Sequence, residues 1–284
     1  MQVTQKNSTT REEVKNVRSI NGLLDELGEL TPNEANNLIK SNNCVVRKRA
    51  IEYADRQSRL KQLLAEDDSN VEELILSSLG DLTVEEANKL LLEAYSYKVK
   101  ENAIRYADRQ SKLSSLLMET NSNFIDFILS SLGGLTVEEA NNLLLEAYSY
   151  KVRENVIRYA DRQSKLERLL VEEIIADLIF YSLGDISTEE ANKLLLEAGD
   201  YNVREMAIKY ADRQTKLARL LVEETSEVID PILNSLGELT IEETDKLLKA
   251  HTLKVIKYAM LNVCSEGLEE LRDVIIEKLK YIKE

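Results

Sequence analysis

The chain repeats itself five times at a nearly constant interval between residues 27 and 249, and this repetition constrains the fold more than any other feature. The string Tyr-Ala-Asp-Arg-Gln starts at Tyr53, Tyr106, Tyr159 and Tyr210. The pair Leu-Gly marks a period of 52, 53, 51 and 53 residues, at Leu27-Gly28, Leu79-Gly80, Leu132-Gly133, Leu183-Gly184 and Leu236-Gly237. Such an interval, built from amphipathic segments, is typical of an array in which each repeat buries its apolar face against its neighbours.

Composition favours long helices in a protein of the cytoplasm. Tryptophan is absent, proline occurs only at Pro32 and Pro231, and apolar residues make up 43% of the chain. Cys44 and Cys264 have no spacing typical of a disulfide framework or a metal site, so we expect a reducing compartment, no metal and no cofactor. No signal peptide or membrane-spanning stretch is indicated. The net charge of −14 opposes loose attachment of the whole body to DNA or anionic lipid.

Each repeat opens with a helix-start signal. Thr83 and Glu86 have the spacing of a capping box, in which a hydroxyl and a carboxylate satisfy two backbone amides at the start of a helix. The apolar residues after Thr83 follow the three-and-four spacing of a buried stripe, so we predict a first helix of about thirteen residues. The same pattern recurs at Thr31/Glu34, with Pro32 in the first turn, and at Thr136/Glu139, Ser187/Glu190 and Thr240/Glu243.

Two more helices are predicted in each repeat. In the second repeat the next apolar stripe runs from about residue 98 to 118, which predicts a single helix roughly 30 Å long. A third helix is predicted over 123–132, closing at Gly133 because glycine suits a left-handed C-cap. Each repeat is therefore expected to contain three helices.

The repeats define one continuous domain over residues 1–284. A lone helix in 1–26, with a capping box at Thr10 and Glu13, is expected to cover one end. The full repeats are 27–78, 79–131, 132–182 and 183–235. A shortened repeat and a C-terminal cap helix, from about residue 266 to 282, occupy 236–284, since an open array needs modified ends for solubility.

This organisation of capped helices at a fixed period resembles the HEAT and armadillo class of α-solenoids. The resemblance implies an all-α, right-handed α-solenoid of about five three-helix repeats with helical caps at both ends. It also implies a curved scaffold that holds a partner on one ridge of stacked helices, without identifying that partner.

Basic residues recur along the predicted second helices, where residues 98–118 and 151–171 each carry a net charge of +3. Stacking would align them into a basic ridge on an acidic body. The alternative is that acid-before-base pairs four residues apart merely stabilise each helix, by about 0.2–0.5 kcal/mol per pair. The ridge residues expected to bind a partner include Lys98, Arg105, Lys151 and Arg158.

One arginine series needs a partner outside its own helix. Three of its members have a basic residue four positions before and a lysine three after, so like charges surround them. The partner is either a glutamate on a neighbouring helix or a bound ligand. The series consists of Arg56, Arg109, Arg162 and Arg213.

A polar ladder is predicted inside the stack. One glutamine per repeat falls in the middle of the second helix's apolar arc, where an unpaired amide would cost on the order of 1–3 kcal/mol. Asparagines in the first helices are the expected hydrogen-bond partners, either fixing how repeats stack or gripping a peptide backbone. The ladder comprises Gln57, Gln110, Gln163 and Gln214 with Asn36, Asn88, Asn141 and Asn192.

The sequence gives no support to catalysis, because His251 is the only histidine and has no acid or thiol at a spacing that would make it a base. We therefore expect a non-enzymatic scaffold that binds an acidic protein or peptide along the basic ridge. Two alternatives stay open: nucleic-acid binding on the same ridge, and end-to-end self-assembly. The oligomeric state is not predicted.

Overall fold

The computed structural model describes residues 20, 22–263 and 271–280, which form an all-helical repeat fold. The chain divides into two compact units, Met1–Gly134 and Leu135–Glu284. Among the described helices, none combines the length and the apolar composition needed to cross a lipid bilayer.

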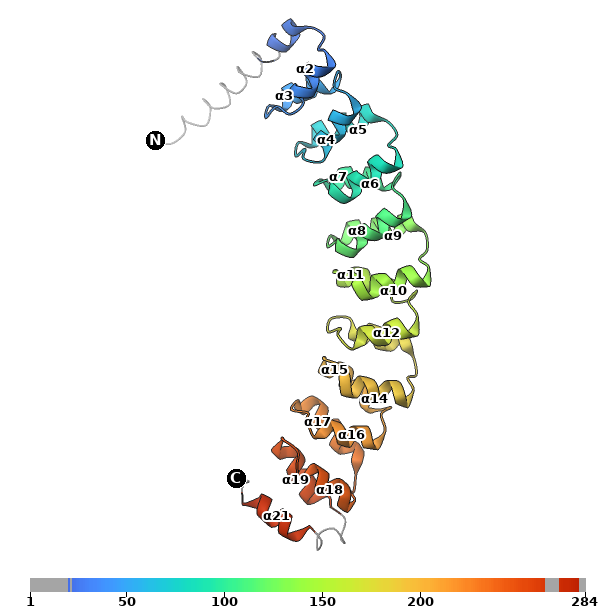
Figure 1. The fold of residues 1–284 in the computed structure, drawn as a ribbon, viewed down its shortest axis with the longest axis vertical. Helices are drawn as coiled ribbons and strands as arrows, with labels where there is room; N and C mark the ends of the chain where they lie inside the picture. The colour runs from blue at the N-terminus through green and yellow to red at the C-terminus, as the bar shows by residue number, and fades with distance from the viewer. Residues whose placement is uncertain (1–19, 21, 264–270, 281–284) are drawn as a thin grey trace, which may run out of the picture. The chain divides into compact units, whose positions relative to one another are not determined.

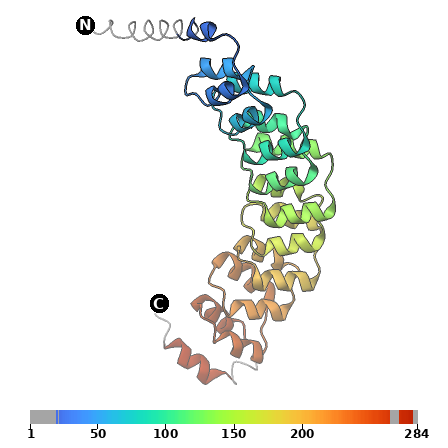
Figure 2. The ribbon, with the colours of Figure 1, turned by 45° about the horizontal axis from the view of Figure 1, so that its top comes forward.

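Unit 1 is a succession of short helices that follows a helical segment at 22–27 (Figure 1). Figure 2 shows these helices, coloured blue to green, running side by side. They are α2 (Pro32–Leu38), α3 (Cys44–Ile51), α4 (Arg56–Leu63), α5 (Ser69–Leu79), α6 (Val84–Glu93), α7 (Tyr97–Ile104), α8 (Arg109–Met118) and α9 (Ser122–Leu132).

Unit 2 repeats this arrangement. Its shortened last repeat ends with an isolated parallel bridge between Leu239 and Val263. The helices are α10 (Val137–Glu146), α11 (Tyr150–Val156), α12 (Arg162–Leu169), α13 (Ala176–Leu183), α14 (Thr188–Glu197), α15 (Tyr201–Ile208), α16 (Arg213–Leu220), α17 (Ser226–Leu236), α18 (Ile241–Leu247), α19 (Leu253–Leu261) and α21 (Arg272–Leu279).

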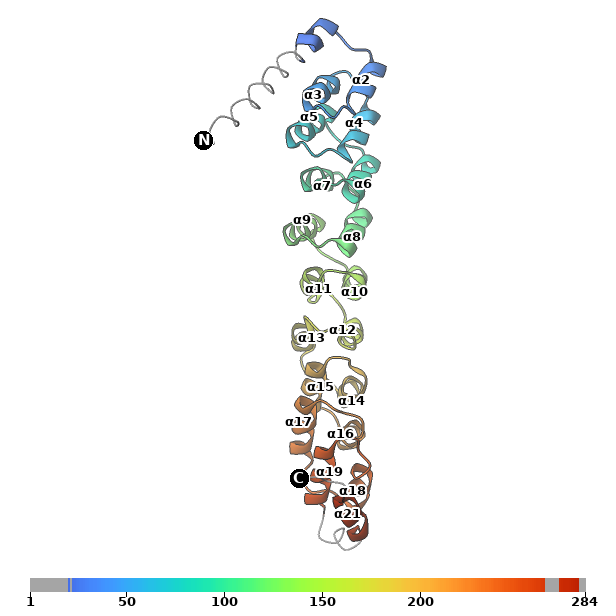
Figure 3. The ribbon, with the colours of Figure 1, turned by 90° about the vertical axis from the view of Figure 1, so that its left-hand side faces the viewer.

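Within each unit the helices form two layers. The even-numbered helices through α18 stack in one layer and the odd-numbered helices through α19 in the other, as Figure 3 shows. Fully buried side chains such as Leu90 of α6, Ile104 of α7 and Leu116 of α8 fill the space between the layers. Burial of this apolar surface drives the stacking of successive repeats.

The predicted long second helix is wrong, because two helices occupy its place. In the second repeat α7 ends at Ile104 and α8 begins at Arg109, with Asp108 as its N-cap. The Asp108 carboxylate accepts a hydrogen bond from the backbone N–H of Ser111 at 2.7 Å, which starts a new helix. The intervening residues 105–108 amount to about one helical turn, so the apolar spacing continues across the break. Each full repeat therefore has four helices, not three.

The predicted helix starts and closing glycines agree with the structure, but the first helix is shorter than predicted: α6 has ten residues, not about thirteen. All five capping boxes form, as at Thr83, whose N–H donates to Glu86 at 2.9 Å. The five Leu-Gly pairs each place the glycine at positive φ, between 64° and 79°, immediately after a helix.

The ends of the chain are described only in part. Residues 22–26 of the predicted N-terminal cap helix are helical, whereas the capping box at Thr10 lies outside the described residues. Helix α21 falls within the predicted C-terminal cap helix, and the rest of that prediction also lies outside them.

Candidate functional site

The arginine of the Tyr-Ala-Asp-Arg-Gln string connects three successive helices. In unit 1, Arg56 at the start of α4 forms a bidentate pair with Glu86 of α6, with both N···O distances 2.7 Å. Its remaining N–H groups donate to the carbonyl oxygens of Leu79, at 2.6 Å, and Asp81, at 2.8 Å. Arg56 therefore ties together the end of α5 and the start of α6. We call this arrangement the arginine clamp.

The clamp recurs in unit 2. Arg162 pairs with Glu190 at 2.6 and 2.7 Å, and Arg213 pairs with Glu243 at 2.7 and 2.9 Å. Arg109 donates to the carbonyl oxygens of Leu132 and Gly134 in unit 1. For Arg56, Arg162 and Arg213, the outside partner is thus a glutamate on a neighbouring helix.

Clamp formation changes the ionisation of the glutamates. The hydrogen bond from the arginine, followed by the capping hydrogen bonds, lowers the pKa of Glu86, Glu190 and Glu243 to about 2, although partial burial opposes the shift. Each of these carboxylates serves the clamp and a capping box together. The charge of the arginine is therefore committed within the fold.

The predicted glutamine–asparagine ladder is wrong. All four glutamines are exposed, because the helix break turns them out of the apolar arc. The asparagines bind the aspartate of the string instead: Asn88 Nδ2 donates to Asp108 at 2.7 Å, and the Asp108 N–H donates to Asn88 Oδ1 at 3.0 Å. The same reciprocal clip joins Asn36 to Asp55, Asn141 to Asp161 and Asn192 to Asp212.

A second set of buried ion pairs was not predicted. Arg204 of α15 bonds to Glu223, which follows α16, at 3.0 Å, and both side chains are almost fully buried. Arg204 also donates to the carbonyl oxygens of Ala198 and Gly199. The same pair recurs as Arg47–Glu66 and as Arg153–Glu172. In the second repeat Lys100 stands in place of the arginine, and the hydroxyl of Tyr97 donates to Glu119. The fixed interval between these glutamates is a signal that could have found them.

The remaining ridge residues lie on the odd-numbered layer. Lys98 of α7 pairs with Glu73 of α5 at 3.1 Å, and both side chains are exposed. Arg105 is exposed just beyond the end of α7. In unit 2, Lys151 is half-buried on α11, and the exposed Arg158 lies over the ring of Tyr159, 4.7 Å from its centroid.

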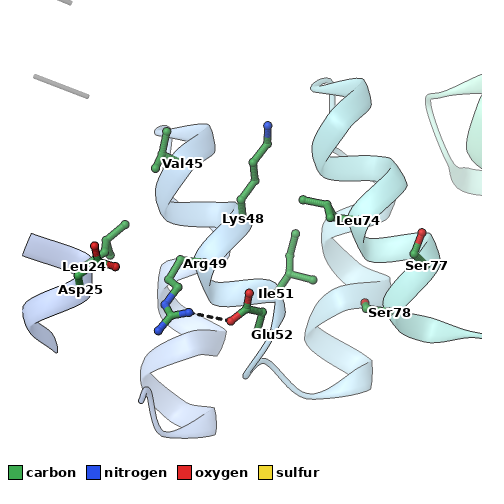
Figure 4. A pocket seen from close by; sticks show the side chains of 10 residues that line it. All are labelled: Leu24, Asp25, Val45, Lys48, Arg49, Ile51, Glu52, Leu74, Ser77 and Ser78. Carbon is green, nitrogen blue, oxygen red and sulfur yellow. Dashed lines mark hydrogen bonds and ion pairs between the residues drawn. The ribbon is translucent and has the colours of Figure 1, made fainter. Parts of the chain in front are cut away.

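A hollow of about 720 Å³ opens on the odd-numbered layer of unit 1, between the helical segment 22–27, α3 and α5. Figure 4 shows Ile51 and Leu74 between α3 and α5, with Leu24 on the adjoining segment. Lys48 and Arg49 also line it, and Arg49 donates to Glu52 at 2.8 Å. The hollow therefore combines apolar walls with two cations and two carboxylates, those of Asp25 and Glu52.

Exposed apolar side chains extend this layer. Leu74 of α5 and Phe127 of α9 are exposed in unit 1, and Leu178 and Tyr181 of α13 are exposed in unit 2. Isolated exposed apolar residues are ordinary, but these occupy the same helix in successive repeats. Each unit therefore presents exposed apolar side chains on its odd-numbered layer.

Comparison of the chain with protein-family models, with curated proteins and with solved structures found no match.

Proposed function

We propose that the protein is a non-enzymatic scaffold that binds an extended, acidic protein or peptide segment on its odd-numbered layer. The hollow of unit 1 is the observation that carries this proposal. Its volume of about 720 Å³ accommodates one or two large apolar side chains. Leu74, which is exposed, would make most of the contact with them, because Leu24 and Ile51 are nearly buried. Lys48 would face a carboxylate of the same segment.

The basic residues of α7 would continue the contact. Glu73, the pairing partner of Lys98, is adjacent in sequence to Leu74 in the hollow, so the two places adjoin. An exposed pair of this kind contributes on the order of 0–1 kcal/mol, and a partner's carboxylate could replace Glu73 at little cost. Arg105 lies just beyond the C-terminal end of α7. Lys151, Arg158, Leu178 and Tyr181 supply the same residue types in unit 2.

Affinity capture from the native host, compared across variants, tests this proposal. Lys48→Glu, Lys98→Glu and Arg105→Glu together should abolish capture of the partner while the thermal midpoint changes little, because Lys98 and Arg105 are exposed and Lys48 is only half-buried. Lys61→Glu and Lys89→Glu on the even-numbered layer are the charge-reversal controls and should leave capture intact. Equal capture by both sets would contradict the proposal.

Nucleic-acid binding is the weaker alternative, because three clamp arginines already bind glutamates. The slope of log binding constant against log salt concentration would be about −3.6 if phosphates were contacted by four basic residues, Lys98, Arg105, Lys151 and Arg158. A gel-shift titration at low salt measures this, and a mobility shift of that salt dependence would displace the protein-binding proposal. For the self-assembly alternative, light scattering would show oligomers that grow with concentration.

A further inference from the structure

In unit 2, the turns that join each even-numbered helix from α10 to α16 to the next odd-numbered helix lie side by side along one edge. The Gly199 N–H donates to the carbonyl of Leu170 at 3.0 Å, and the Thr252 hydroxyl donates to the carbonyl of Glu223 at 2.9 Å. Arg153 bonds to both Tyr148, through its carbonyl, and Glu172. The turns thus form a continuous surface, the loop edge, made of residues 145–149, 170–174, 196–200 and 221–225.

Large apolar side chains stand exposed along the loop edge. Tyr148 is 73% exposed, Val171 69%, Ile174 70% and Val222 59%. Val171 and Val222 occupy equivalent positions in successive repeats. Val171 lies two residues after the end of α12, and Val222 lies two residues after the end of α16. The buried ion pairs beneath them hold the turns in place, so these side chains are presented on an ordered backbone.

The charge of the loop edge is acidic. Its four segments contain seven acidic residues and no lysine or arginine. Four arginines reach it from adjoining helices, all with side chains no more than 17% exposed and bonded to Glu172 or Glu223. Within the four segments, the exposed charged residues are therefore all acidic: Glu146, Glu173, Glu197 and Glu224.

Two of these carboxylates sit where they oppose helix stability. Glu146 and Glu197 are the last residues of α10 and α14, and neither helix has a basic residue in its last turn. The C-terminus of a helix carries partial negative charge, so an acidic side chain there is unfavourable. An external cation near these helix ends would relieve that repulsion.

We propose that the loop edge of unit 2 binds a basic, amphipathic protein segment, whose apolar side chains cover Val171, Ile174 and Val222 and whose lysines or arginines meet Glu146 and Glu197. The face of Tyr148 offers a further cation contact. The charge selects this occupant, since a second copy of the edge and an anionic lipid surface would both be repelled. Unit 1 carries the same residue types at Glu93, Tyr95 and Met118. This surface differs in position and charge from that of the proposed function, so either can fail alone.

Fluorescence anisotropy with a labelled synthetic peptide of lysine and leucine at helical spacing tests the inference. Glu146→Gln with Glu197→Gln should weaken binding about tenfold, whereas Glu138→Gln with Glu189→Gln, at the opposite ends of the same two helices, should change it less than about twofold. Val171→Ser with Ile174→Ser should weaken binding to a similar degree. A peptide with glutamate in place of lysine should not bind.

Three results would overturn the inference. The wild-type protein could fail to bind the lysine–leucine peptide. Both glutamine pairs could weaken binding equally, which would mean that the net charge of the protein alone attracts the peptide. Sedimentation could show a wild-type dimer that Val171→Ser with Ile174→Ser dissociates, which would make a second copy the occupant. Circular dichroism checks that every variant is folded.

Discussion

Replacing Arg162 with alanine should destabilise unit 2 substantially. The change removes hydrogen bonds to both oxygens of Glu190 and to the carbonyls of Leu183 and Asp185, all between 2.6 and 2.8 Å. Hydrogen bonds to charged groups contribute about 1.5–3 kcal/mol each when buried. Because the Arg162 side chain is 43% exposed, solvent compensates much of this loss, and we expect a net cost of about 2 kcal/mol.

Urea unfolding followed by circular dichroism measures this cost against a matched control. Arg158→Ala, one turn earlier, removes only an exposed contact with Tyr159 and should cost less than about 0.5 kcal/mol. Glu190→Gln keeps the capping box, since glutamine can fill that role, so a double-mutant cycle isolates the charged pair at about 1 kcal/mol. Equal costs for Arg162→Ala and Arg158→Ala would refute the clamp.

Three further predictions concern pH and local geometry. Glu190 has a pKa of about 2 in the folded protein against an ordinary 4.5. Its contribution to stability is therefore complete above pH 4.5 and is lost as the pH falls toward 2. In an acid titration, the free energy of unfolding of Glu190→Gln should decline less steeply than that of the wild type. Asn141→Ala should lower the thermal midpoint by about 3 °C through loss of the clip, whereas Asn142→Ala, exposed beside it, should have almost no effect in the same calorimetric scan. Gly184→Ala should cost about 1 kcal/mol because its φ is +68°, whereas Gly199→Ala meets its nearest atom at an ordinary 3.6 Å and should cost less than about 0.5 kcal/mol in urea unfolding.

Local rules were enough to locate the first and last helices of each repeat. Thr83 with Glu86 and the glycine after each third predicted helix are chemical signals read over a few residues, and both appear in the structure. The break before Arg109 gave no such signal, since Asp108 lacks a glutamate three residues on and the apolar spacing continues past it. Periodicity alone could not separate one helix from two.

The candidate site depended on that break. Treating residues 98–118 as one helix placed the string's glutamine in the core and assigned its aspartate to a pair with the lysine four residues on. In the structure, Asp108 instead caps α8 and binds Asn88. The need of the arginine series for an outside partner could be predicted from like charges alone. The identity of that partner depends on which residues the turn after α5 brings near Arg56, and only three-dimensional packing determines this.

The central structural claim is that the string's arginine holds neighbouring repeats together, and the ionisation of Glu190 tests it most directly. Carbon-13 NMR of the side-chain carboxyl during an acid titration, assigned by comparison with Glu190→Gln, gives its pKa. The clamp predicts a value of about 2 in the wild-type protein and a return toward 4.5 in Arg162→Ala. A wild-type carboxyl that titrates near 4.5 would show that Arg162 is not bound to it, and the account would fail.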